Sequence, residues 1–296
     1  GGFDARLDWG KMYLEKGLVD SACFWFHAAA TIKPDNPEVW YQLSVTEQAR
    51  GNIATAFSYA EKALAETPYD GNVLTQLGIL YQKSGQAQKA LQCFRQAYRY
   101  EPASYLSALN LGREFQTLKI YDSAVFYMNQ SLALSDGILD DDSRFLTQLG
   151  YLELGLNQLD SALVHTQLAL KVTANDITVN RQLGIILNQM NRNPEALTYF
   201  REAYRLSPGS ILEIINLGLA FEKSGHYDSA YQYLYKGVEQ GGAAVKNPIF
   251  YRALFNSCLA LGKTDKARQL LNELESFAPD FRDLDEMRRR FKENGG

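Results

Sequence analysis

Residues 71–104 read GNVLTQLGILYQKSGQAQKALQCFRQAYRYEPAS, and this stretch shows most clearly the pattern from which the fold can be predicted. A large apolar residue is followed by a small one at Leu77-Gly78, and Ala90 comes twelve residues after the glycine. On both sides of Gly85 the apolar residues recur at the spacing of one helix face, which predicts two amphipathic helices separated by a turn. The stretch therefore predicts a helical hairpin.

The same pattern recurs along the chain at an almost fixed step. The large–small pairs are Trp9-Gly10, Leu43-Ser44, Leu77-Gly78, Leu111-Gly112, Leu149-Gly150, Leu183-Gly184 and Leu217-Gly218, at steps of 34 residues with one step of 38. An alanine follows each small residue after twelve positions, and Leu254-Phe255 with Ala267 supplies an eighth unit. One hairpin cannot bury its apolar face alone, so tandem hairpins predict an all-α solenoid of stacked helix-turn-helix units.

The third unit is similar to the tetratricopeptide repeat, whose pattern is W-x2-L-G-x2-Y, then A-x3-F, then P over 34 residues. It matches at Leu74, Leu77-Gly78, Tyr81, Ala90, Phe94, Ala97 and Pro102, and the second unit supplies the tryptophan at Trp40. The resemblance implies a right-handed superhelix that binds a protein or peptide ligand in its concave groove. The eight repeats are expected at residues 3–36, 37–70, 71–104, 105–142, 143–176, 177–210, 211–247 and 248–281.

A solenoid needs a polar cap at each end. Residues 282–296 are expected to be a capping helix and tail. Three apolar residues of this segment share one helix face with the preceding Phe281: Leu284, Met287 and Phe291. No such helix precedes residue 3, and we expect the N-terminal edge to be uncapped. Two hinges are expected, one at the acidic run between repeats 4 and 5 (Asp136, Asp140, Asp141 and Asp142) and one at Gly241-Gly242.

Composition narrows the class of partner. The chain has 30 basic and 34 acidic residues, a net charge of −4, which disfavours nucleic acid. No run of eighteen apolar residues is long enough for membrane insertion. Cys23, Cys93 and Cys258 are interpreted as buried reduced thiols, which favours the cytoplasm. Gly1-Gly2 resembles a trimmed start, so a periplasmic or membrane-anchored origin stays open, as does the oligomeric state.

The sequence lacks the common catalytic and dinucleotide-binding motifs. There is no GxSxG, HExxH or GxGxxG, and no nucleophile stands beside an evident base. His27, His165 and His226 lie in different repeats, and none has a second His or Cys at i+3 or i+4, so no metal site and no cofactor are expected. Asp20, Asp122, Asp160 and Asp228 are interpreted as helix caps and dipole partners. We therefore expect a non-enzymatic chain.

A row of amides is the candidate binding feature. Under the resemblance, the sixth position of each repeat faces the concave groove, and six consecutive repeats carry an amide there: Gln42, Gln76, Asn110, Gln148, Gln182 and Asn216. Asn and Gln offer both donors and an acceptor, so such a row can bind the backbone of an extended peptide. The row is similar to the asparagine ladder of the O-linked N-acetylglucosamine transferases. The alternative is a polar face that only keeps the groove soluble.

Charge along the expected groove is polarised. Repeats 1 and 2 offer Asp4, Asp8, Glu15 and Glu38 against Lys11, whereas repeats 3 to 6 offer Lys83, Arg113, Arg144 and Arg181 without an acid. A cleft of one sign favours a ligand of the other. The carboxylate clamp of chaperone-binding relatives begins with a basic residue and an asparagine, found together only as Arg252 and Asn256 in the last repeat, where no repeat follows to complete it.

The sequence thus predicts an adaptor that holds an extended, acidic segment in its groove. A first alternative is that the chain is the substrate-docking or regulatory region of a larger enzyme whose catalytic domain lies outside it. A second is binding of single-stranded RNA, which the acidic total, the 34-residue spacing and the scarcity of groove aromatics disfavour.

Overall fold

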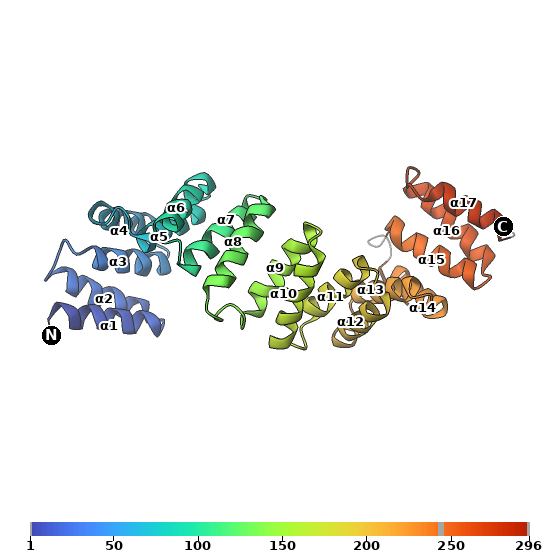
Figure 1. Cartoon of the computed structure of the whole chain (residues 1–296), viewed down its shortest axis with the longest axis horizontal. Coiled ribbons are helices and arrows are strands. Elements are labelled where there is room, and N and C mark those ends of the chain that lie inside the picture. The colour runs from blue at the N-terminus through green and yellow to red at the C-terminus, as the bar shows by residue number, and fades with distance from the viewer. Residues whose placement is uncertain (1, 242–245, 295–296) are drawn as a thin grey trace. The chain divides into compact units, whose positions relative to one another are not determined.

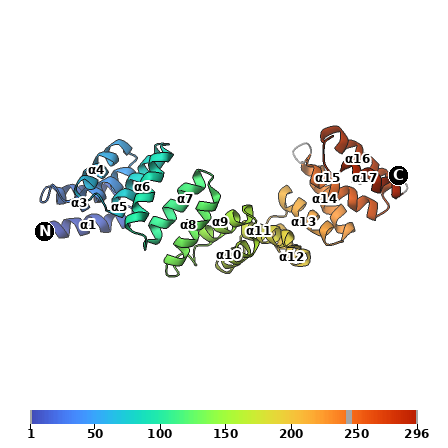
Figure 2. The same cartoon turned by 45° about the horizontal axis from the view of Figure 1, so that its top comes forward.

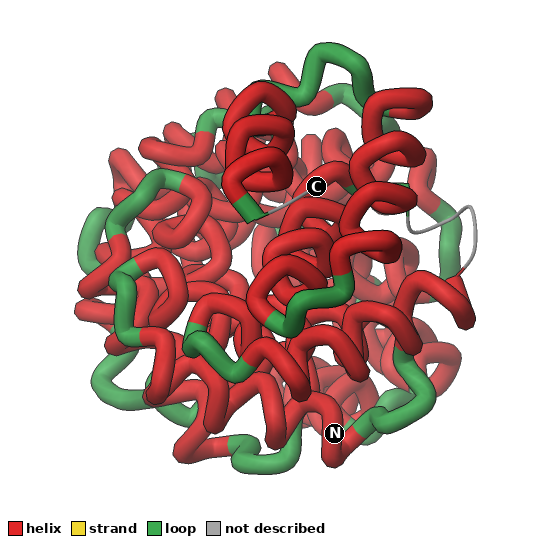
Figure 3. Tube along the Cα trace, turned by 90° about the vertical axis from the view of Figure 1, so that its right-hand side faces the viewer, coloured by secondary structure: helices red, strands yellow, loops and turns green. Residues whose placement is uncertain are grey.

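The computed structural model describes residues 2–241 and 246–294, and within these ranges it contains helices and no strand (Figure 3). In chain order the helices are α1 (Phe3–Glu15), α2 (Val19–Ala30), α3 (Pro37–Ala49), α4 (Ile53–Glu66), α5 (Gly71–Lys83), α6 (Ala87–Tyr100), α7 (Tyr105–Thr117), α8 (Tyr121–Leu134), α9 (Ser143–Gly155), α10 (Leu159–Val172), α11 (Ile177–Gln189), α12 (Asn193–Leu206), α13 (Ile211–Lys223), α14 (Tyr227–Gly241), α15 (Pro248–Ala260), α16 (Thr264–Phe277) and α17 (Leu284–Glu293). The all-α fold and its helical repeats are as the sequence predicts.

The helices pair as hairpins, with an odd-numbered helix followed by the even-numbered helix that packs against it (Figures 1 and 2). Helix α17 is the additional helix at the end. The chain divides into two compact units, Gly1–Leu139 with α1 to α8 and Asp140–Gly296 with α9 to α17. The division falls within the acidic run, next to Asp142, whose carboxylate caps α9.

Each turn between the two helices of a hairpin contains a residue with positive φ. At equivalent places the chain has Gly17, Gly51, Gly85, Lys119, Asn157, Asn191, Gly225 and Gly262, with φ between 59° and 84°. Beyond this residue an amide donates back into the first helix, as when the Asn52 N–H bonds the Glu47 carbonyl at 2.8 Å. Such left-handed closure is a common way to end a helix, and glycine adopts it without steric cost.

Helix starts differ between the two helices of a hairpin. The first helix is commonly capped by a side chain, as when the Asp70 carboxylate accepts the amides of Asn72 and Val73 at 2.8 and 3.1 Å. Helices α2, α8 and α10 have no side-chain cap, because Asp20, Asp122 and Asp160 already lie in the first helical turn. These three aspartates lie where a negative charge interacts favourably with the helix dipole. They do not cap the helices, so the interpretation of them as caps was wrong.

The small residue on the first helix lets the two helices of a hairpin approach closely. A Cβ added to Gly78 would stand 2.5 Å from a ring carbon of Phe94, and one added to Gly184 would stand 2.7 Å from Phe200. Each ring fills the space that the missing side chain leaves, and both rings are nearly fully buried. The packing of α5 on α6 and of α11 on α12 therefore requires the glycine.

Helix α17 covers the end of the second unit. It buries Leu284, Met287 and Phe291, and the Phe291 ring centroid lies 6.4 Å from that of Phe255 on α15. The charged residues of α17 are mostly exposed, as a capping helix requires. Of the second expected hinge, Gly241 ends α14 and Gly242 lies outside the described residues.

Candidate ligand-binding face

Two of the six predicted amides are buried in contacts between neighbouring hairpins. The Gln76 amide nitrogen donates to Ser44 Oγ at 3.2 Å and to Gln48 Oε1 at 3.0 Å, both on α3. The Gln182 amide nitrogen donates to Thr166 Oγ1 at 3.0 Å and to the carbonyl of Thr147 at 3.2 Å. Each side chain is only 5% exposed. These two amides therefore join one hairpin to the next.

The other four amides are half-buried. Gln42 donates to Glu38 one turn earlier on α3, at 2.9 Å. Asn110 lies on α7 and Asn216 on α13, and Gln148 lies on α9 where it lines a pocket. Each of these four amides is partly accessible. The row predicted from the sequence therefore consists of two buried and four half-buried side chains.

Three of the four predicted cations are exposed, and the fourth is paired. Lys83, Arg113 and Arg144 are exposed on α5, α7 and α9. Arg181 on α11 forms an ion pair of 2.6 Å with Glu213 on α13, whose side chain is 2% exposed. The prediction that this region offers cations without an acid overlooked Glu213, which stands in the next repeat. Arg181 is therefore committed to a contact within the protein.

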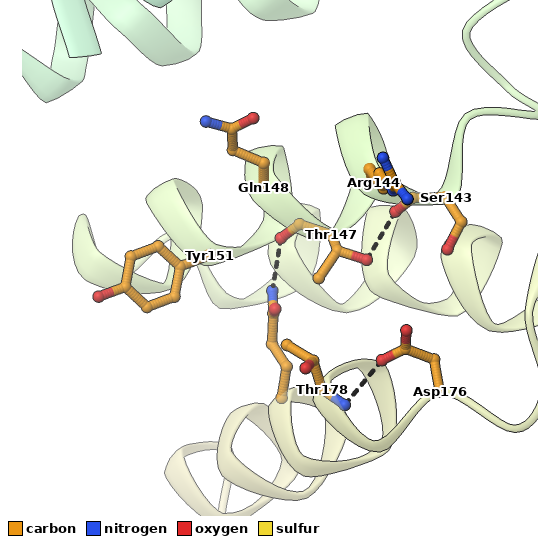
Figure 4. Close-up of a pocket in the computed structure, with 8 residues that line it drawn as sticks. Ser143, Arg144, Thr147, Gln148, Tyr151, Asp176 and Thr178 are labelled. Atoms are coloured by element: carbon orange, nitrogen blue, oxygen red, sulfur yellow. Dashed lines mark hydrogen bonds between the residues drawn. The ribbon is translucent and has the colours of Figure 1, made fainter. Parts of the chain in front are cut away.

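A pocket of about 360 Å³ opens within the second unit, between α9 and α11 (Figure 4). The side chains from α9 are Ser143, Arg144, Thr147, Gln148 and Tyr151, and those from the start of α11 are Asp176, Thr178 and Gln182. Figure 4 shows Arg144 and Tyr151 on either side of Thr147, with the Gln148 amide between them along the helix. A cation, an aromatic ring and an amide thus share one opening.

The floor of this pocket is held by hydrogen bonds. Thr147 Oγ1 donates to the Ser143 carbonyl at 2.6 Å, and Gln182 bonds the Thr147 carbonyl. The Asp176 carboxylate accepts the amides of Thr178 and Val179 at 2.7 and 3.0 Å, so its charge serves the start of α11. Arg144 is exposed and Tyr151 is 65% exposed, so these two remain accessible to a ligand.

The residues that imitate the start of a carboxylate clamp have internal partners. Arg252 pairs with Asp283 at 2.5 Å, and the Asn256 amide donates to Glu222 at 2.8 Å while its oxygen accepts from Arg290. These contacts bring α15 to α13 and to the segment of α17. Both side chains therefore serve packing at the end of the second unit.

One buried carboxylate in the first unit is poorly solvated. Glu114 on α7 accepts from the Gln82 amide at 2.8 Å, but its Oε1 has no hydrogen-bond partner among the described residues. Burial raises the pKa of Glu114, and the bond from Gln82 opposes this only in part. The protonated form is favoured there more than at an exposed glutamate.

The histidines have environments that the sequence analysis did not foresee. His165 Nδ1 lies 2.8 Å from the buried carboxylate of Glu153. His27 is exposed, yet one of its ring nitrogens lies within 4.8 Å of donor atoms of Cys23 and Glu47. Cys23 precedes His27 by four residues, so the pair stands at i−4 and not at the i+3 or i+4 positions that the sequence pattern tested. The same spacing towards the N-terminus was the signal for this pair.

The comparisons with known proteins agree on the repeat. The family model described as tetratricopeptide repeat matches residues 59–92. The peroxisomal targeting signal receptor of Saccharomyces cerevisiae is 24% identical over 230 residues, which are 76% of this chain and 38% of the receptor. The anaphase-promoting complex subunit cut9 of Schizosaccharomyces pombe is 25% identical over 62% of this chain and 28% of that subunit. The chain thus spans less than two fifths of either relative.

Solved structures show the same fold at low identity. YrrB, a TPR protein with an unusual peptide-binding site, superposes with a TM-score of 0.58 at 20% identity, over 66% of this chain and 96% of YrrB. PilW, a type IV pilus biogenesis factor, gives a TM-score of 0.54 at 20% identity, over 73% of this chain and 97% of PilW. Within the described residues no helix is both long and apolar enough to cross a bilayer.

Proposed function

Because the chain is a tandem array of tetratricopeptide repeats, we propose that it is a non-enzymatic scaffold that binds an extended, acidic segment of a partner protein. The proposal rests chiefly on the pocket between α9 and α11, where Arg144 and Tyr151 are exposed and Gln148 is half-buried. An arginine can bind a carboxylate through two donors, and a tyrosine can pack on an apolar stem.

The cations on the other first helices support the same ligand class. Lys83 and Arg113 are exposed on α5 and α7 of the first unit, as Arg144 is in the second. All three cations are exposed on the first helix of a hairpin, in a protein whose net charge is −4. Such an arrangement favours an acidic ligand and makes its binding dependent on salt.

The relatives are consistent with a binding role. One is a receptor for a peroxisomal targeting signal and another is a subunit of the anaphase-promoting complex, and the structural neighbour YrrB has a peptide-binding site. These properties belong to those proteins. They support the view that a repeat array of this kind holds a polypeptide.

The test is a titration with two fluorescent peptides, one of alternating Glu and Ser and one of alternating Gln and Ser. Arg113→Ser with Arg144→Ser should weaken the acidic peptide by about five- to thirtyfold at low salt, because each charged hydrogen bond contributes on the order of 1 kcal/mol there. Binding of the Gln peptide should change little. The difference between variant and parent should shrink as salt is added.

The matched control replaces one exposed cation on a second helix of each unit, Arg99→Ser on α6 with Lys171→Ser on α10. This variant has the same net charge as the first. Equal weakening by both variants would mean that only total charge matters and would overturn the assignment to the first helices. Unchanged binding in the Arg113 and Arg144 variant would also overturn it.

A further inference from the structure

Three side chains that bind transition metals meet near the start of the first unit. Cys23 and His27 stand four residues apart on α2, hence on the same face of the helix, and Glu47 reaches them from α3. The donor atoms, one from each side chain, lie within 4.8 Å of one another, and Cys23 Sγ is 3.3 Å from Glu47 Oε1. Two hairpins thus bring together a thiol, an imidazole and a carboxylate.

The burial of the three residues resembles that of a site with one open side. Cys23 is 7% exposed and Glu47 is 4% exposed, whereas His27 is exposed at the surface. The two buried donors therefore have fixed positions, and the accessible imidazole can turn towards a captured ion. The His27 ring also lies edge-on to Tyr59, with 6.2 Å between ring centroids, which limits where it can turn.

Glu47 is one of two glutamates at its place in the repeat, the other being Glu153 in the fifth. The third, fourth and seventh repeats carry Tyr81, Phe115 and Phe221 at the equivalent positions. Its carboxylate is oriented by Asn52, whose amide donates to Oε2 at 2.6 Å and leaves Oε1 facing Cys23. Outer hydrogen bonds of this kind hold metal ligands in place and are part of most metal sites.

A cation already neutralises this cluster. One Arg50 guanidinium nitrogen lies 2.9 Å from Glu47 Oε1 and 3.5 Å from Cys23 Sγ. The side chain of Arg50 is 39% exposed, and its Nε lies 3.1 Å from the carboxylate of Asp20, whose side chain is 89% exposed. The guanidinium can therefore move outwards to Asp20, and a second cation can then take its place between the buried donors.

We propose that Cys23, His27 and Glu47 form a binding site for one zinc ion, with a water or a partner's side chain as the fourth ligand. Thiolate, imidazole and carboxylate are the ligands that zinc takes in proteins, and three protein ligands leave one position open. In a tetrahedral site, bond lengths of about 2.0–2.3 Å place ligand atoms about 3.3–3.7 Å apart. Cys23 and Glu47 already have this separation, so a rotation of His27 completes the site.

The test uses Co²⁺ as a spectroscopic probe of the full chain under reducing conditions, followed by displacement with Zn²⁺. We expect one equivalent of Co²⁺ to give a thiolate-to-metal charge-transfer absorption that Zn²⁺ removes. Cys23→Ser should abolish this absorption. His27→Gln should weaken the affinity by about 10- to 100-fold, and since the residue is exposed the fold should be retained. Far-ultraviolet circular dichroism checks the fold of each variant.

Two further variants separate this site from adventitious binding. Cys93→Ser combined with His165→Gln removes another thiol and another imidazole and should leave the affinity unchanged. Arg50→Gln should raise the affinity, because the competing cation is lost. Absence of the absorption in the parent, its persistence in Cys23→Ser, or equal affinity in His27→Gln and the parent would each overturn the proposal. The outcome does not depend on whether the chain binds peptides.

Discussion

The close approach of α5 and α6 can be tested by adding one carbon atom. In Gly78→Ala the new Cβ would stand 2.5 Å from Phe94 Cε1 and 2.8 Å from two more ring carbons, so the ring must move by roughly 1 Å to restore ordinary contact. Phe94 is 2% exposed and has little space in which to move. Overpacking of this kind costs about 1–3 kcal/mol. Alanine regains about 1 kcal/mol of helix propensity over glycine.

The net expectation for Gly78→Ala is a loss of about 1 kcal/mol in the free energy of unfolding, measured by urea denaturation. Gly78→Leu should lose about 3 kcal/mol, because three more carbon atoms must fit beside the ring. The matched control is Gly155→Ala at the end of α9, where an added Cβ meets nothing within 4 Å. This control should be neutral or stabilising.

The second repeat suggests a compensating change. At the positions equivalent to Gly78 and Phe94 it carries Ser44 and Ala60, so a larger first-helix residue stands with a smaller second-helix residue. Gly78→Ser with Phe94→Ala copies this pair and should be more stable than the sum of the two single losses. If Gly78→Ala unfolds at the same urea concentration as Gly155→Ala, or if the double variant shows no compensation, the packing argument is refuted.

Two more predictions concern the thermal stability of the protein. Deleting residues 282–296 should lower the melting temperature and cause association on size exclusion, because α17 buries Met287 and Phe291 on the last hairpin, whereas deleting 294–296 should change neither property. Glu114→Gln should raise the melting temperature at pH 7. The pKa of Glu114 is raised in the folded protein, so the contribution of its carboxyl to stability is present below the ordinary glutamate pKa. That contribution is lost as the pH rises through the folded-state pKa. The advantage of Glu114→Gln should shrink towards about pH 4, where the native carboxyl is also neutral, and a constant advantage would contradict this reasoning.

The fold was predictable because one weak sequence pattern occurs many times at a nearly fixed step. One Leu77-Gly78 pair is uninformative, but the same pair followed by an alanine at a step of 34 residues identifies both helices of each hairpin. The turns were partly predictable for the same reason, since Gly85 and Asn191 tolerate the left-handed conformation. Lys119 was not, because lysine has no such preference and only the register identifies it.

The candidate site was less predictable because side-chain partners come from neighbouring repeats. The register placed Gln76 and Arg181 on the expected face, but it did not show that Gln76 bonds Ser44 or that Arg181 pairs with Glu213. These partners stand about one repeat length away in the sequence. The Cys23 and His27 pair was visible at a spacing of four residues, whereas its meeting with Glu47 depends on how α2 packs against α3.

The buried amides Gln76 and Gln182 make one repeat dependent on the repeat before it, although all repeats share one sequence pattern. Each is matched to a hydroxyl supplied by the hairpin before it, Ser44 in one case and Thr166 in the other. At the places equivalent to these hydroxyl residues the third repeat has Gly78 and Phe94, which could satisfy neither glutamine. Placing a copy of the third repeat directly before either glutamine would therefore remove one of its two hydrogen bonds, at a cost of about 0.5–1.5 kcal/mol. A rearrangement that keeps these bonds must therefore move the two adjacent repeats together.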